Sequence, residues 1–331
     1  MSSSSLHVQR AAGVEMVIAI DSTTRGPALG GCRWRSYRDS SDARADARAL
    51  AAAMTRKAAL AGLALGGGKA VISGDPAQRT RDQLLAFGDF VASLDGRYCA
   101  AADMGTGEDE MAVIAEKTSH VIGLPRALGG CGDPGPFTAM GVLAAMQMAL
   151  EQRDRSLRGA RVAVQGVGNV GGALVCELIA AGASVVVADP DLESLAALPG
   201  GADVVATDTI LEQDCDVFAP CGPPSVIDVA RAGTLRCSIV CGAANNPLAD
   251  ARAARVLSER QILYVPDFLA NAGGLIHLSV ARDGGDDAKS KSRLCVIPEN
   301  LKRVLALCGE RDLDPLAAAD VLVRDALESG S

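Results

Sequence analysis

The sequence has few histidines and no closely spaced cysteine pairs. It contains three histidines among 331 residues, and its ten cysteines are scattered singly from Cys32 to Cys308 without a C-x-x-C pair. Structural metal sites need clusters of such ligands at short spacing. We therefore expect no metal site, and we expect reduced thiols of the kind found in cytoplasmic proteins.

Long apolar runs and an excess of positive charge are also missing. No run approaches the ~20 apolar residues of a membrane helix, and the opening MSSSSLHVQR lacks the apolar core of a signal peptide. The net charge of −8 argues against a general affinity for nucleic acid or anionic membranes. A content of 49% hydrophobic and 22% charged residues is instead typical of a globular protein, and the length favours roughly two domains.

The sequence pattern changes at a Pro/Gly-rich segment, GGCGDPGPFT. Before it, VEMVIAIDST and KAVIS predict strands, and SDARADARALAAAMTRKAALAG predicts a long helix capped by Ser41 or Asp42 and stopped by Gly62. After it, short apolar strands alternate with helical stretches or loops, which indicates a parallel sheet covered on both faces. We predict an α/β protein with one domain over 1–136, a second over 138–283, and helices in 284–331 that pack back on the first.

The first strand of the second domain leads into a glycine-rich fingerprint. Gly166, Gly168 and Gly171 form G-x-G-x-x-G between a strand and a helix, whose start at Asn169 and Val170 would face phosphates. Asp189, followed by Pro190, ends the next strand, where an acid binds the ribose 2′-hydroxyl. A chance glycine-rich turn is the alternative, but the order of strand, helix and acid favours a Rossmann-type dinucleotide site.

A second glycine-rich stretch, LALGGGKAV, resembles a buried turn that presents Lys69. It does not match a phosphate-binding loop, because Leu63 takes the place of the first glycine and Ala70 that of the Ser or Thr. Lys69 is therefore interpreted as a reacting group, with a surface lysine after a turn as the alternative. Lys57 shares a helix face with Leu50, Ala53 and Met54, and could be a nearby cation that promotes this role.

Six stretches carry a resemblance to a known family. They are GPALGGCRW, AMTRKAALAGLALGGGKAVI, RYCAAADMGTGEDEM, VAVQGVGNVGG, CGAANNPLAD and PDFLANAGGLI, in this order between Asp21 and Leu278. In them the chain resembles the glutamate/leucine/phenylalanine/valine dehydrogenase family. The resemblance implies NAD(P)-dependent oxidative deamination of an L-amino acid to a 2-oxo acid and ammonia, the reverse reaction, and a homo-oligomer formed through the first, substrate-binding domain.

The resemblance also assigns roles to residues. Lys57 matches the lysine that binds the substrate carboxylate, Lys69 the lysine that activates water, and Asp103 the acid that exchanges protons with the amino group. It further implies contacts to the substrate from Gly30, Gly31 and Asn246, and contacts to the cofactor from Ala243, Asn245 and Asn271. Taken alone, Asp103 could cap a loop and the Asn pair could form a turn. A non-catalytic nucleotide-binding regulator is the alternative from another class; the two lysines and Asp103 argue against it.

The cofactor and the substrate class follow from charge. We predict NAD rather than NADP, because Asp189 would repel a 2′-phosphate and ADPDLES contains no lysine or arginine. Glutamate-specific relatives place a lysine where Leu29 stands, and a leucine there would leave the second carboxylate unpaired. The pocket candidates Leu29, Ala101, Leu275 and Leu278 are all apolar. We therefore predict a branched-chain amino acid as substrate, with phenylalanine as the alternative.

Overall fold

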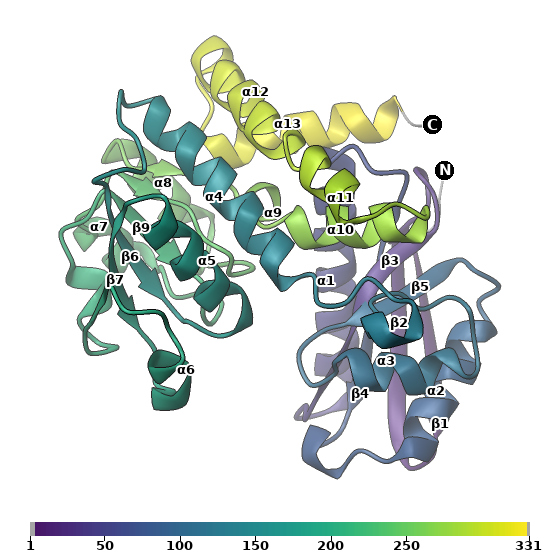
Figure 1. The fold of residues 1–331 in the computed structure, drawn as a ribbon. Helices are drawn as coiled ribbons and strands as arrows, with labels where there is room; N and C mark the ends of the chain where they lie inside the picture. Colours follow the sequence, from purple (N-terminus) through teal and green to yellow (C-terminus); the bar gives the residue numbers. More distant parts are fainter. Residues whose placement is uncertain (1–3, 330–331) are drawn as a thin grey trace. The chain divides into compact units, whose positions relative to one another are not determined.

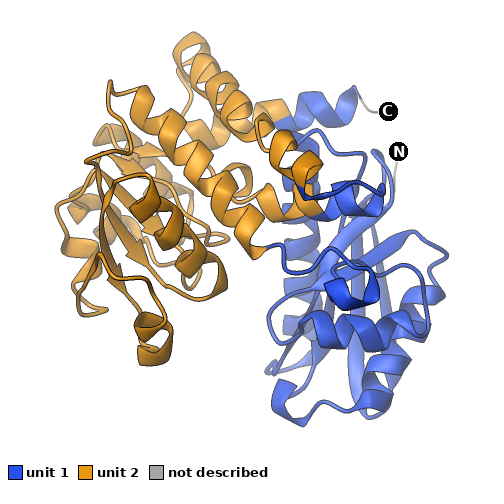
Figure 2. Cartoon of the chain, in the orientation of Figure 1, with its two compact units in different colours: residues 1–134, 278–287, 323–331 blue, residues 135–277, 288–322 orange. Residues whose placement is uncertain are grey.

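The computed structural model describes residues 4–329 and divides the chain into two compact units (Figure 2). The first consists of Met1–Pro134, Leu278–Asp287 and Val323–Ser331, and the second of Gly135–His277 and Ala288–Leu322. Within the described residues, no helix has both the length and the apolar character needed to cross a membrane.

The first unit is built on a mixed five-stranded sheet with the order β1-β2-β4-β3-β5. Strand β3 pairs in parallel with β4 and with β5, whereas β2 pairs antiparallel with β1 and β4. Figure 1 shows this sheet between α1 on one face and α2 and α3 on the other. The bounds are β1 (Ser5–Ala11), β2 (Val14–Ser22), β3 (Ala28–Arg35), α1 (Ser40–Leu60), β4 (Gly66–Ser73), α2 (Arg81–Ala92), β5 (Tyr98–Ala102) and α3 (Glu108–Ala115).

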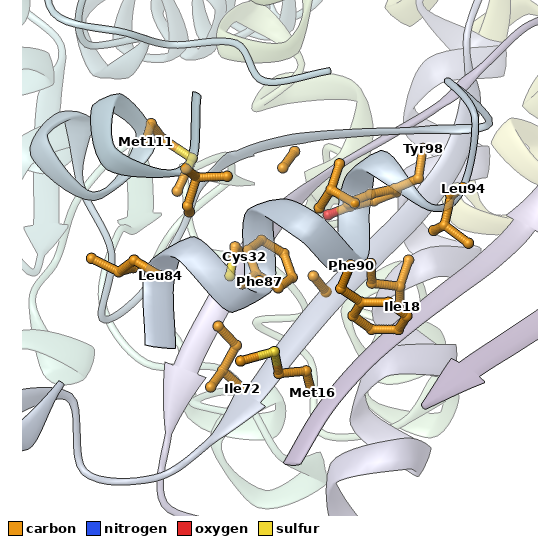
Figure 3. Packing of buried hydrophobic residues seen from close by; sticks show 14 of the residues in the cluster. Met16, Ile18, Cys32, Ile72, Leu84, Phe87, Phe90, Leu94, Tyr98 and Met111 are labelled. Carbon is orange, nitrogen blue, oxygen red and sulfur yellow. The ribbon is translucent and has the colours of Figure 1, made fainter. Parts of the chain in front are cut away.

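Large apolar side chains fill the space between this sheet and helices α2 and α3. Phe87 of α2 and Met111 of α3 are fully buried against Ile18, Ile72 and other residues of the sheet (Figure 3). Helix α2 begins with a capping box, in which Thr80 and Gln83 satisfy each other's backbone N–H groups. This face of the sheet is therefore an ordinary hydrophobic core.

Helix α1 covers part of the opposite face with alanines. Ala43, Ala47 and Ala51 pack on small and branched residues of β2 and β4. The face predicted to be apolar, which carries Leu50, Ala53, Met54 and Lys57, is only half-buried, because short alanine side chains make the closer contact with the sheet. The cap is Asp39, which accepts hydrogen bonds from the backbone N–H groups of Ser41 and Asp42, rather than either of those two residues.

The GGGK stretch is part of strand β4 and not a turn. Strand β4 begins at Gly66 and includes all three glycines. A Cβ atom at Gly67 would collide with the backbone nitrogen of Thr55 in α1. The glycines are therefore explained by the close approach of neighbouring elements to the strand.

The second unit contains a six-stranded sheet in which every pairing is parallel. Its order is β11-β10-β9-β6-β7-β8, the strand order of a Rossmann fold. The sequence pattern missed β8, a short edge strand with a largely exposed surface. The bounds are β6 (Arg161–Gln165), α5 (Asn169–Ala180), β7 (Ser184–Ala188), α6 (Leu192–Ala196), β8 (Ala202–Val204), β9 (Val217–Pro220), α7 (Val229–Thr234), β10 (Ile239–Val240), α8 (Ala251–Glu259) and β11 (Leu263–Tyr264).

Most of the C-terminal segment packs in the second unit. Residues 288–322 belong there, whereas the sequence led us to expect 284–331 on the first segment. The reason is close packing within that unit. A Cβ at Gly141 of α4 would lie 2.7 Å from Ile297 of α12, and Ser290 of α11 hydrogen-bonds to His277, whose ring stacks on Phe137 of α4. These helices are α4 (Gly135–Glu151), α9 (Asp267–Ala270), α10 (Gly273–Arg282), α11 (Asp287–Arg293), α12 (Val296–Arg311) and α13 (Pro315–Glu328).

Candidate active site

The predicted catalytic and pocket residues of the first unit share one face of its sheet. In the parallel register Leu29 lies opposite Gly67, and Gly31 lies opposite Ala101. Residues two apart in a strand point to the same face, so Lys69 lies on the face of Gly67, and Asp103 follows Ala101 on the same side. The structure thus brings Leu29, Gly31, Lys69, Ala101 and Asp103 together on the face that α1 partly covers.

An ion pair between Lys69 and Asp103 forms the centre of this face. The Lys69 Nζ atom lies 2.6 Å from Asp103 Oδ2, and the two side chains are 7% and 23% exposed. Burial alone would raise the pKa of Asp103, but the adjacent cations Lys69 and Arg33 hold that pKa below its usual value. Asp103 is therefore a carboxylate at neutral pH, and it keeps enough exposed surface to meet a small molecule.

The loop after β5 fixes the position of Asp103. The backbone N–H of Asp103 donates to Thr106 Oγ1, and the Thr106 hydroxyl lies 2.7 Å from the carbonyl oxygen of Cys32 in β3. A Cβ atom at Gly31 would lie 2.6 Å from Asp103 Cβ, so only glycine leaves room for the acid. A Cβ atom at the neighbouring Gly30 would collide with the Gly68 carbonyl, and the Gly30 carbonyl accepts a hydrogen bond from the Tyr98 hydroxyl at 2.6 Å.

The remaining predicted substrate residues divide between the units. Lys57 lies half-buried in the last turn of α1. Leu278 belongs to the first unit, where its Cδ2 atom lies 3.6 Å from the position of a Cβ at Gly123. Leu275 and Asn246 belong to the second unit. Both leucines are buried.

In the second unit the three fingerprint glycines have three different surroundings. Gly166 has a φ of +90°, and a Cβ there would lie 2.8 Å from Gly222. A Cβ at Gly171, in the first turn of α5, would collide with the Gly166 carbonyl. At Gly168 no heavy atom lies within 4 Å of such a Cβ. This is the pattern of a tight turn, a helix packed on its strand and an open approach for a pyrophosphate, and Asn169 and Val170 begin the helix that follows.

Asp189 binds the backbone of the glycine turn through one carboxylate oxygen and that of the segment after β7 through the other. Oδ2 accepts the backbone N–H of Val167 at 2.7 Å, and Oδ1 accepts that of Asp191 at 2.8 Å. Pro190 lies between the two acids and is exposed. The Asp189 carboxylate is thus held at the carboxyl end of β7, beside the turn, where a ribose hydroxyl would be recognised.

A cluster of amides lies beyond the carboxyl end of β10. Asn271 donates through Nδ2 to the Ala243 carbonyl at 3.1 Å and to Asn245 Oδ1 at 3.0 Å. Its own Oδ1 is buried without a hydrogen-bond partner. A buried unpaired carbonyl oxygen costs free energy unless a ligand donates to it, so Asn271 fits a cofactor or substrate N–H group.

Sequence reasoning missed several residues that hold these groups. Asp267 accepts the backbone N–H of Asn246 at 2.8 Å and the Tyr264 hydroxyl at 3.0 Å. Arg33 contacts both Asp103 and Asp46. Asp267 and Arg33 lie inside the stretches PDFLANAGGLI and GPALGGCRW, and a charged residue within a buried apolar segment was the available signal.

Comparison with known proteins identifies the class to which this fold and site belong. Residues 2–120 match the family model described as Glu/Leu/Phe/Val dehydrogenase, dimerisation domain, and residues 129–192 and 187–284 match that of Glutamate/Leucine/Phenylalanine/Valine dehydrogenase. The chain belongs to this family, and it is an amino acid dehydrogenase that uses a pyridine nucleotide.

Particular relatives extend the similarity along the chain. A valine dehydrogenase of Streptomyces virginiae is 42% identical over 319 residues, covering 94% of this chain and 89% of that protein. A leucine dehydrogenase of Bacillus subtilis is 39% identical over 321 residues, covering 96% and 88%. The crystal structure of L-tryptophan dehydrogenase from Nostoc punctiforme superposes with a TM-score of 0.83 at 34% identity, covering 98% and 96%.

Proposed function

We propose that this protein catalyses the NAD-dependent oxidative deamination of a branched-chain L-amino acid, such as valine, leucine or isoleucine, to its 2-oxo acid and ammonia, and the reverse reaction. The observation that supports this most directly is the Lys69–Asp103 ion pair of 2.6 Å on a sheet face that also carries Leu29 and Ala101. An acid–base pair beside apolar side chains suits an amino acid whose only charged groups are its carboxylate and its ammonium.

The residues divide the chemistry between them. Lys57 binds the substrate carboxylate, and Asp103 takes a proton from the ammonium group so that the amine can lose hydride from Cα. NAD, which Gly168, Asp189 and Asn271 of the second unit would hold, would supply the acceptor for that hydride. Lys69 then removes a proton from the water that attacks the imine carbon, and Asp103 returns a proton to the departing nitrogen as ammonia leaves. Two electrons and one proton leave the substrate as hydride, and water supplies the oxygen of the product.

The residues of the proposed cofactor site in the second unit suit NAD better than NADP. Gly168 opens toward the pyrophosphate position, Asn271 presents an unpaired oxygen, and Asp189 is an anion where NADP carries its 2′-phosphate. Pro190, Ala243 and Asn245 complete the proposed cofactor contacts. A clear preference for NADP in kcat/KM would refute this assignment.

The apolar side chains favour a branched aliphatic substrate. Leu29 and Ala101 are almost fully buried, and a second carboxylate against Leu29 would lose its hydration without a partner. Leucine at position 275 reduces the volume left for an aromatic ring, although one methylene of misfit changes discrimination by only ~1–3 kcal/mol. Gly30, Gly31, Asn246 and Leu278 are proposed to complete this site.

The deciding experiment measures kcat/KM by NADH formation with valine, leucine, phenylalanine and glutamate. We expect valine or leucine to exceed phenylalanine, and glutamate to be very poor. A preference for phenylalanine would overturn the size argument, and a preference for glutamate would overturn the apolar pocket. In Lys57→Ala we expect mainly a higher KM for the amino acid, because the variant loses a carboxylate contact made in both ground and transition states.

We further propose a homo-oligomer formed through the first unit, which is supported by the dimerisation-domain description of the family model for residues 2–120. We also propose a cytoplasmic location, for which ten cysteines scattered singly along the sequence are suited. Light scattering of the purified protein tests the assembly, and a monomeric mass would contradict it.

A further inference from the structure

Arg33 lies on the same sheet face as the catalytic pair and contacts the same carboxylate oxygen. Its Nε atom lies 3.1 Å from Asp103 Oδ2, the atom that Lys69 Nζ also approaches at 2.6 Å. The Arg33 side chain is 14% exposed. Asp103 thus has two cationic neighbours, one from β4 and one from β3.

A second carboxylate holds Arg33 from its other side. Arg33 Nη1 lies 3.3 Å from Asp46 Oδ2, and the Tyr37 hydroxyl donates to that same Asp46 oxygen at 2.6 Å. Burial and the contact with Asp46 raise the pKa of Tyr37, so the phenol stays protonated as a donor. The guanidinium is therefore fixed between two carboxylates from different elements, with Asp46 supplied by α1.

The two cations at Asp103 differ in whether they can lose a proton. Lysine can do so, and in the proposed reaction Lys69 must gain and lose protons as it activates water. Arginine keeps its charge throughout. When Lys69 is neutral, Arg33 is still a cation in contact with the partly buried Asp103 carboxylate.

We propose that Arg33 is a positioning residue that keeps Asp103 ionised and fixed through the catalytic cycle, with Asp46 holding Arg33 in place. Because both cations contact Oδ2, we assign Oδ1 to the substrate amino group. This inference rests on the proposed function, in which Asp103 exchanges protons with the amine.

The other titratable groups around Asp103 do not supply this charge. Cys32 of β3 and Tyr98 of β5 both interact with Asp103, and burial raises the pKa of each, so both stay neutral. The charged side chains that contact Asp103 in the salt bridges described here are Lys69 and Arg33, with Asp46 behind Arg33. Removing Arg33 takes away a cation that lowers the pKa of Asp103, so that pKa should rise.

The test compares Arg33→Gln, Arg33→Lys and Asp46→Asn with the wild type. In Arg33→Gln we expect kcat to fall about 10–100-fold with a much smaller change in the KM of the amino acid, because positioning is lost while Lys57 remains. The acidic limb of the kcat/KM profile should move up by about one pH unit or more. In Arg33→Lys the acidic limb of the kcat/KM profile should return to its wild-type pH, while kcat stays reduced. In Asp46→Asn kcat should fall, while the acidic limb stays at its wild-type pH.

Arg35→Gln is the matched control. Arg35 lies two residues along β3, is exposed, and contacts the Ser36 carbonyl and the Tyr37 ring. Within residues 4–329 it forms no salt bridge with a carboxylate. Its kinetics should match the wild type. The rise in the Asp103 pKa that is expected for Arg33→Gln should also be seen without turnover. Carbon NMR of aspartate-labelled protein titrates the Asp103 carboxyl directly, and Asp103→Asn identifies its signal.

The outcomes separate the two proposals. If the wild type oxidises no amino acid, the proposed function fails, while the NMR titration still reports on the contact between Arg33 and Asp103. If the wild type is active and folded Arg33→Gln keeps its kcat, its pH profile and its Asp103 titration, the inference about Arg33 is overturned. Circular dichroism of each variant establishes folding, and Arg33→Lys provides a test if Arg33→Gln does not fold.

Discussion

The lack of a side chain has opposite consequences in the two glycine-rich segments of this protein. In β4, Gly66–Gly68 lie inside a strand and let other parts of the protein approach, including the backbone of Thr55 in α1. In the turn after β6, Gly168 faces open space, while Gly166 and Gly171 permit the turn and its packing. Glycine therefore brings protein to protein in the first unit, and it leaves room for a ligand in the second.

The largest expected effect concerns the reacting residues beside the first segment. Lys69→Ala and Asp103→Asn should lower kcat by about 10²–10⁴-fold, because each removes a proton-transfer group. The affinity for NAD, measured by titration, should stay near the wild-type value because both residues lie in the first unit. As a control, Lys117→Ala removes a more exposed lysine of the same unit and should leave kcat at the wild-type value. An unchanged kcat in Lys69→Ala would rule out the mechanism.

A methyl group on the strand glycine tests close packing. In Gly67→Ala the new Cβ meets the backbone nitrogen of Thr55, so α1 must move away from the sheet. We expect the free energy of unfolding to fall by ~1–3 kcal/mol, as in other overpacked cores. Urea denaturation measures this. Stability equal to that of the wild type would show that α1 moves away at no cost.

The same methyl group on the turn glycine is the matched contrast. In Gly168→Ala the Cβ meets no protein atom within 4 Å, so stability should change by less than about 0.5 kcal/mol. The Kd for NADH should rise about tenfold, which corresponds to ~1.4 kcal/mol. If NADH binding is unaffected, Gly168 does not lie against the pyrophosphate.

The smallest expected effect concerns the acid that braces the turn. Asp189→Asn removes the charge but keeps a carbonyl oxygen for one of the two backbone N–H groups now bound. The preference for NAD over NADP, as a ratio of kcat/KM values, should fall about two- to fivefold, since charge effects at exposed sites amount to about 0.5–1 kcal/mol. A ratio that stays constant would place the source of specificity elsewhere.

The sequence pattern predicted the second unit better than the first. Strands such as RVAVQ are buried on both faces, so their apolar runs are conspicuous, and β6 matches that segment residue for residue. In the first unit, KAVIS was predicted as a strand and lies in β4, but the three glycines before it gave no strand signal, because glycine has no side chain to show alternation. The alanines of α1 concealed which helix face is buried. The C-terminal helices have ordinary helical periodicity, which does not specify the surface on which they pack.

By itself, the sequence determined the α/β class and the glycine fingerprint followed by its acid, since these follow from local spacing and side-chain chemistry. Its resemblance to the family also pointed to Lys69 and Asp103 as candidate reactive groups. Only the tertiary structure decided that the three glycines of GGGK belong to a strand, and that Arg33 and Asp46 join Lys69 and Asp103 in one network of ion pairs. Asp46 lies on a helix and Arg33 on a strand, and Asp103 follows another strand far along the chain. Their contacts depend on strand register and helix packing, which pair residues distant in sequence and leave no local pattern in it.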